Sequence, residues 1–253
     1  MKIRAGIELG NLTDIGCQRD ENQDSYCYAE PESEEAFHKK GRLVMIADGM
    51  GGHVGGKMAS GIAVDAFRSA FVSSDLEDPE AALTEALRAA HLAIRGFVRE
   101  HPEYSGMGTT CTAAVLRDGQ LYYGHVGDSR LYLVRESKIT QLTRDHTMVG
   151  RMVEQGLLRE DEVKDHPDRH VLISAMGVGE SLFADLPGAP IPLFPEDILL
   201  LCTDGLYDTI SDEELRVMVS HGSAGAACRQ LIETAKARGG QDNITVQIVR
   251  IQK

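Results

Sequence analysis

The chain has 253 residues, of which 42% are hydrophobic and 26% charged, a composition typical of a folded globular protein. Its net charge of −13 argues against nucleic-acid binding, because a phosphate backbone attracts basic surfaces. The sequence contains neither the ~20-residue apolar run of a membrane span nor a secretory signal, and its five cysteines include no C-x-x-C pair. We therefore expect a reduced, cytoplasmic protein without a membrane segment, folded as a single domain over residues 1–253.

The first stretch of chemical interest along the chain is the polar loop RDENQD, residues 19–24. Arg19 offers a planar set of donors that suits phosphate oxygens. Asp24 is a candidate for orienting waters on bound metal ions. Taken alone, this hexapeptide is typical of a solvated loop, so its interpretation depends on the residues that the fold brings beside it.

An apolar run at residues 42–47 predicts a buried strand, which ends at Asp48-Gly49. The glycine cluster that follows approaches the nucleotide-binding pattern G-x-x-x-x-G-K-[ST], but Met58 stands where that pattern needs a hydroxyl. We therefore interpret these glycines as letting the backbone pass close to metal ions and an incoming phosphate. Residues 58–72 then predict a helix.

A second helix is predicted to begin at Asp78 as its N-cap, with Pro79 at the first helical position. Its apolar stripe consists of Leu83, Leu87, Ala90, Ile94 and Phe97. Residues 109–142 predict a meander of antiparallel strands, with hairpin turns at Asp118-Gly119 and Glu136-Ser137.

Residues 147–180 mix Gly, His, Asp and Pro with weak periodicity, which indicates a flap over one end of the fold. The apolar run 197–203 predicts a second buried strand, which ends at Asp204-Gly205. Ser211 and Glu214 form a capping-box pattern, and the last strand follows Asp242. Hairpin groups with helices between them favour an α+β fold over a doubly wound parallel sheet.

Four aspartates share one setting, because each lies where a predicted strand begins or ends: Asp48, Asp128, Asp204 and Asp242. A carboxylate at a strand end is well placed to bind a cation, and a neighbouring glycine lets its carbonyl approach as well. Oxygen ligands select magnesium or manganese rather than zinc. A single aspartate is more typical of a turn or cap, so it is the repetition that predicts a metal site.

The motifs RDENQD, DGMGGH, GDSR, CTDGLYD and DNIT, in this order, resemble those of the metal-dependent protein serine/threonine phosphatases (PPM, or type 2C), and of their short bacterial branch in particular. The resemblance covers roughly residues 10–250. It implies a four-layer α/β/β/α sandwich of two antiparallel sheets flanked by helices, with a flap at roughly 147–180. It also implies two Mn²⁺ or Mg²⁺ ions per chain and a position for a third.

The resemblance further implies a role for each aspartate. Asp48 would bridge both metals, and the Gly49 carbonyl would bind one of them. Asp204 and Asp242 would bind the other metal. Asp128, together with Asp204, corresponds to the ligands of a third and weaker metal.

The implied reaction is hydrolysis of phosphoserine and phosphothreonine in proteins. The implied role is to oppose a bacterial Ser/Thr kinase, with that kinase and its targets as the substrates. Two cations lower the pKa of a shared water, and the resulting bridging hydroxide attacks phosphorus while Arg19 holds the phosphate. Met50 stands where eukaryotic members have a histidine, so the acid that protonates the leaving oxygen stays open. The candidates are a metal-bound water, His53 and His146.

Two other functions compete with this one. Cys111 and Arg117 have the spacing of the cysteine-phosphatase signature, but the TAAVL between them predicts a strand rather than a glycine-containing phosphate loop. A catalytically weak regulatory or binding module of the same fold is the other alternative. It is disfavoured because every aspartate expected at a metal position is present.

Overall fold

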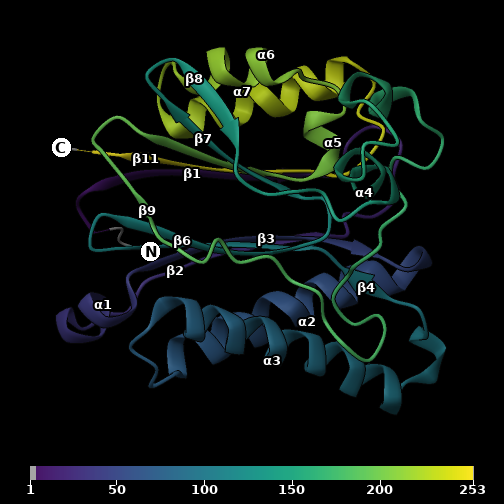
Figure 1. The fold of residues 1–253 in the computed structure, drawn as a ribbon, viewed down its shortest axis with the longest axis horizontal. Helices are drawn as coiled ribbons and strands as arrows, with labels where there is room; N and C mark the ends of the chain where they lie inside the picture. Colours follow the sequence, from purple (N-terminus) through teal and green to yellow (C-terminus); the bar gives the residue numbers. More distant parts are fainter. Residues whose placement is uncertain (1–3, 253) are drawn as a thin grey trace.

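The protein is a four-layer sandwich in which two antiparallel sheets pack face to face and helices cover both outer faces (Figure 1). The computed structural model describes residues 4–252, without the side chains of residues 52–54. None of the helices in this described part has the length and apolar character needed to cross a membrane. The predicted fold class and layer order are confirmed.

The first sheet has the strand order β1-β11-β10-β7-β8. Its strands are β1 (Ile7–Asp14), β11 (Ile244–Ile251), β10 (Ile198–Cys202), β7 (Arg130–Arg135) and β8 (Lys138–Gln141). Its outer face is covered by α6 (Asp212–Val219) and α7 (Ala224–Ala237), and the short α5 (Asp204–Tyr207) follows β10 directly (Figure 1).

The second sheet has the order β2-β3-β5-β6-β9, and β4 pairs with the end of β3. Its strands are β2 (Asp24–Ala29), β3 (Arg42–Met50), β4 (Gly108–Thr109), β5 (Cys111–Arg117), β6 (Gln120–Val126) and β9 (Ile191–Pro192). The long helices α2 (Gly52–Ser73) and α3 (Pro79–Glu100) cover it, α1 (Glu34–Lys40) links β2 to β3, and the 3₁₀ turn η1 (Pro102–Tyr104) follows α3.

The apolar runs that predict buried strands lack alternation because both faces of these strands are buried. In β3, Leu43 and Met45 pack under α2 and α3, whereas Val44 and Ile46 face the other sheet. In β10, Leu199 belongs to the same inter-sheet layer. Each strand therefore contributes to two of the three apolar layers.

The predicted helix signals are confirmed at two positions. The Asp78 carboxylate accepts hydrogen bonds from the backbone N–H groups of Glu80 and Ala81 at the start of α3. The backbone N–H of Ser211 donates to Glu214 Oε2 at 3.0 Å, as a capping box requires.

The helix predicted over 58–72 begins earlier than expected, at Gly52. The glycine cluster forms its first turn instead of a separate loop. The reason is close packing, because a Cβ on Gly49 would lie 2.0 Å from the carbonyl oxygen of Gly56. Only glycines allow β3 and the start of α2 to approach so closely.

The predicted meander is two hairpins that belong to different sheets. The β5–β6 hairpin turns at Asp118-Gly119 in the second sheet, and β7–β8 turns at Glu136-Ser137 in the first. All four turn residues have positive φ, as a two-residue hairpin loop requires. The chain crosses between the sheets after β6, through Gly127.

The segment 147–180 contains α4 (Met148–Glu154) and the 3₁₀ helix η2 (Glu160–Asp165). It leaves the first sheet after β8 and returns along the edge of the second. Its ends are tied down by isolated bridges between Thr147 and Leu172 and between Thr109 and Met176.

Candidate metal centre

The four aspartates singled out in the sequence line one cavity of about 830 Å³ at one end of the sandwich. Asp48 lies near the end of β3, and Asp128 follows β6. Asp204 follows β10 as the first residue of α5, and Asp242 precedes β11. Two residues from each sheet therefore meet where the strand ends converge.

The backbone around Asp48 is fixed by two threonines. Its N–H donates to Thr110 Oγ1 at 2.9 Å, and its carbonyl accepts from Thr109 Oγ1 at 2.7 Å. Gly49 lines the same cavity, and no larger residue fits there because of the contact with Gly56 described above. This part of β3 is therefore held rigidly at the cavity wall.

Asp24 connects the two sheets beneath the cavity. It lies opposite Asp48 in the β2–β3 register. Its Oδ2 accepts hydrogen bonds from Thr203 Oγ1 at 3.0 Å and from Thr245 Oγ1 at 2.6 Å. Thr245 lies in β11 of the other sheet, and Thr203 directly follows β10 of that sheet. Its Oδ1 is buried and has no hydrogen-bond partner. Burial raises the pKa of Asp24 to about 7, although the two hydroxyls act in the opposite direction.

Asp48, Asp128 and Asp204 also have raised pKa values. Burial, followed by the neighbouring Asp242 and Asp208, raises the pKa of Asp204 to about 6. The pKa values of Asp48 and Asp128 are raised well above the ordinary range, again mainly by burial. The cluster is thus a group of buried, mutually repelling carboxylates.

Two carboxylates in this cluster leave oxygen atoms without a donor. Asp204 Oδ1 is buried and has no hydrogen-bond partner. Asp128 is only 6% exposed, and none of the hydrogen bonds or ion pairs among the described residues ends on its carboxylate. Hard divalent cations bind such oxygen-rich groups and would compensate both the charge and the missing donors. The residues present therefore fit divalent metal ions.

Arg19 lies at the mouth of the cavity, where its Nη2 contacts Asp242 Oδ2 at 2.6 Å and its side chain is 55% exposed. Asn243 holds the loop that carries it. The Asn243 amide accepts from the backbone N–H of Gln23 at 2.8 Å and donates to the carbonyls of Ile15 and Glu21. The arginine is thereby presented beside the carboxylates yet open to solvent.

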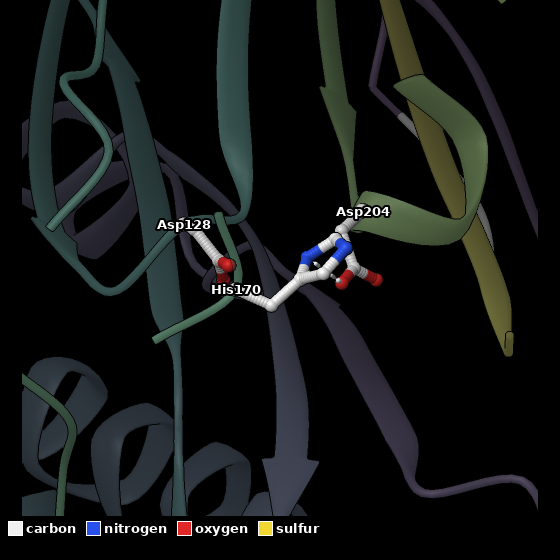
Figure 2. A group of neighbouring side chains, drawn as sticks. All are labelled: Asp128, His170 and Asp204. Carbon is white, nitrogen blue, oxygen red and sulfur yellow. Dashed lines mark ion pairs between the residues drawn. The ribbon is translucent and has the colours of Figure 1, made fainter. Parts of the chain in front are cut away.

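His170, from the 147–180 segment, lines the cavity but was not predicted as a site residue from the sequence. Its Nδ1 lies 3.5 Å from Asp204 Oδ2, and its Nε2 lies 3.2 Å from Asp208 Oδ2. Figure 2 shows His170 turned toward Asp204 with Asp128 beside it. The only signal in the sequence was a histidine in a segment rich in His and Asp, which does not distinguish a site residue from a solvated one.

The other candidate residues stand apart from the cavity or lie outside the described part. His146 is 3% exposed, packs against His125 and Phe183, and is not among the cavity residues. The side chain of His53 lies outside the described residues. Cys111 is fully buried in β5, and burial raises the pKa of its thiol. A buried strand thiol is not a phosphatase nucleophile.

Comparisons with known proteins agree with this site. A family model described as Protein phosphatase 2C matches residues 20–245. The chain is 35% identical over 219 residues to the serine/threonine protein phosphatase PstP of Mycobacterium tuberculosis, a match that covers 87% of this chain and 42% of PstP. It is 32% identical over 242 residues to the serine/threonine phosphatase stp of Listeria welshimeri, with 94% and 93% of the two chains covered.

The solved structures give the same result. The serine/threonine phosphatase Stp1 of Staphylococcus aureus superimposes with a TM-score of 0.89 at 29% identity, over 100% of this chain and 98% of that one. The catalytic domain of PstP in complex with two manganese ions gives 0.84 at 32% identity, over 98% and 99%. The chain belongs to the protein phosphatase 2C family, the metal-dependent serine/threonine phosphatases.

Proposed function

We propose that the protein hydrolyses phosphoserine and phosphothreonine in proteins, using Mn²⁺ or Mg²⁺ ions held by its carboxylate cluster. The observation that carries this proposal is the pair of buried carboxylate oxygens without donors at Asp24 and Asp204, beside the 6% exposed Asp128, in a member of this family. The manganese ions in the PstP structure support the choice of cation.

We assign Asp48, the Gly49 carbonyl, Asp204 and Asp242 as the ligands of two cations. We also assign Asp204, together with Asp128, to the position of a third cation. Their location at the strand ends around one cavity supports this assignment. Asp24 is held by hydroxyls through one oxygen, and we propose that its other oxygen orients a water on the cations.

Cations bound there would supply a hydroxide nucleophile from water at neutral pH and neutralise the phosphoryl charge. Arg19 would exchange part of its contact with Asp242 for the equatorial oxygens of the phosphate, for which its planar guanidinium is suited. The bond between phosphorus and the serine or threonine oxygen breaks as the new bond to the water oxygen forms.

We further propose that the substrates are a Ser/Thr kinase and its phosphorylated targets. The reaction would take place in the cytoplasm, with residues 1–253 as one domain and roughly 147–180 as a flap. One feature supports the compartment and another supports the flap. All five cysteines are free, as expected in a reducing compartment. The 147–180 segment contributes His170 to the rim of the cavity.

The test is hydrolysis of a phosphothreonine peptide with Mn²⁺, with Mg²⁺ and with a chelator, for the parent and for Asp204→Asn. We expect activity that requires the cation and falls by on the order of 10²- to 10³-fold in the variant, since charge stabilisation of the reacting phosphoryl group is lost. Asp118→Asn is the matched control, because it makes the same change in an Asp-Gly pair that serves only a hairpin turn.

Two results would contradict the proposal. Activity that persists in the chelator would exclude metal-dependent hydrolysis. A folded chain that binds Mn²⁺ but hydrolyses nothing would instead make it a regulatory or binding module of the same fold.

A further inference from the structure

The carboxylates of Asp128 and Asp204 share their side of the cavity with the imidazole of His170. One ligand atom from each of the three residues lies within 4.8 Å of the others (Figure 2). We propose that His170 is a direct ligand of a divalent cation held with Asp128 and Asp204, and that this nitrogen makes the site prefer Mn²⁺ over Mg²⁺. The inference rests on the proposed metal-dependent function, because Asp204 is also assigned to one of the other two cations.

The two carboxylates have coordination positions to offer. The Asp128 carboxylate is nine-tenths buried and receives no hydrogen bond within the described residues. Asp204 Oδ1 is buried and likewise without a donor. A buried carboxylate without a donor is costly, and a cation is the partner that suits both groups at once.

The orientation of the imidazole is that of a metal-binding histidine. Nε2 of His170 faces the Asp208 carboxylate at 3.2 Å, and Nδ1 faces Asp204. Histidines that bind metals commonly donate one ring N–H to a carboxylate, which fixes the tautomer and leaves the other nitrogen for the metal. Asp208 would play that part here.

The backbone next to His170 is held in place, so the ring is not at the tip of an unrestrained loop. The carbonyl of the next residue, Val171, accepts a hydrogen bond from Met148 at 2.8 Å. The N–H of Ile173 donates to the carbonyl of His146, also at 2.8 Å. A cation at this position would therefore connect the anchored part of the 147–180 segment to both sheets.

The donor set determines which cation is favoured. Mg²⁺ prefers six oxygen ligands and gives up its waters reluctantly, whereas transition-metal ions accept an imidazole nitrogen readily. Two carboxylates and one imidazole should thus favour Mn²⁺ at this site. The oxygen ligands assigned to the other two cations carry no such preference.

The test is equilibrium binding of Mn²⁺ to the chelator-stripped full chain, followed by the electron paramagnetic resonance of free Mn²⁺. We expect His170→Gln to weaken only the weakest class of site, by about 10- to 100-fold. We also expect Mg²⁺ to displace the weakly bound Mn²⁺ more readily from the variant than from the parent. His38→Gln, an exposed histidine on α1, is the matched control and should bind as the parent does.

A spectroscopic readout tests direct ligation. Electron spin echo modulation from a ¹⁴N nucleus should be present in parent protein loaded with Mn²⁺ and lost in His170→Gln, while His38→Gln keeps it. Unchanged Mn²⁺ binding in His170→Gln, or modulation that persists, would overturn the inference. Both readouts measure metal binding and not catalysis, so this inference and the proposed function can fail separately. A parent protein without phosphatase activity would refute the proposed function, and the binding results would still decide whether His170 is a ligand. The same holds for a parent protein that is active.

Discussion

At the scale of single residues, Asp24 shows how the site is supported from below. Its carboxylate accepts one hydrogen bond from Thr245 in β11 and one from Thr203, which directly follows the neighbouring strand β10, and the contact with Thr245 is the shorter one. We expect Thr245→Val to lower the unfolding free energy by about 1–3 kcal/mol at pH 8, because a buried carboxylate loses a donor. Urea unfolding in chelator measures this. Thr84→Val, on the exposed face of α3, should change stability by less than about 0.5 kcal/mol, and equal effects of the two substitutions would contradict the supporting role.

The residues that could be predicted from sequence are those whose setting is local. Asp48 and Asp204 follow visible apolar strands, so their position at a sheet end could be inferred before any contact was known. His170 and Asn243 could not be identified in this way. Their roles depend on contacts with residues 34 and more than 200 positions away along the chain, which only the path of the loops determines.

At the scale of elements, the strands and long helices were predictable because their signals are periodic or capped. The start of α2 was predicted wrongly, since glycines are poor helix formers and usually end or interrupt a helix. Here tertiary packing overrides that propensity, because the first turn of α2 must approach Gly49. The two hairpins after residue 109 were predicted correctly, but their assignment to different sheets was not, because turn chemistry says nothing about which sheet a hairpin joins.

The close packing between β3 and α2 gives a prediction for this pair of elements. Gly49→Ala adds a Cβ that would meet the Gly56 carbonyl oxygen at 2.0 Å, so the first turn of α2 must move away from the cavity wall. We expect a loss of about 1–3 kcal/mol in unfolding free energy together with weaker Mn²⁺ binding. Thermal unfolding and Mn²⁺ titration measure the two effects.

Gly61→Ala is the matched control. It lies in the middle of α2 with nothing within 4 Å of the added carbon, and it should be neutral or stabilising by up to about 1 kcal/mol. A neutral Gly49→Ala would show that α2 does not need this contact.

At the scale of the whole molecule, the sandwich brings the strand ends of both sheets to one cavity and buries their carboxylates there. The net charge of −13 was visible in the composition. The raised pKa values of the buried carboxylates could not be predicted from the composition, because the pKa of a carboxylate depends on its burial and on the carboxylates around it. Asp24 and Asp204, with pKa values raised to about 7 and about 6, change charge near neutral pH.

The stability of the metal-free protein should therefore fall as the pH rises from 6.5 to 8. The folded-state pKa of Asp24 is raised above its ordinary value of 3.8, so the folded state binds more protons than the unfolded state, and this contribution is lost as the pH passes about 7. The raised pKa of Asp48 acts in the same direction. Buried His125 acts in the opposite direction, since its pKa is lowered to about 3. It reduces stability only below about pH 6.5, where the unfolded chain begins to gain its proton.

We expect the unfolding free energy in chelator to fall by on the order of 1–3 kcal/mol between pH 6.5 and 8. With saturating Mn²⁺ we expect a smaller loss or a gain, because cations then replace the protons. Urea unfolding at both pH values, with and without Mn²⁺, measures this. Asp24→Asn should flatten the slope in chelator, and a metal-free protein that is equally stable at pH 6.5 and 8 would contradict the burial of charge on which the site depends.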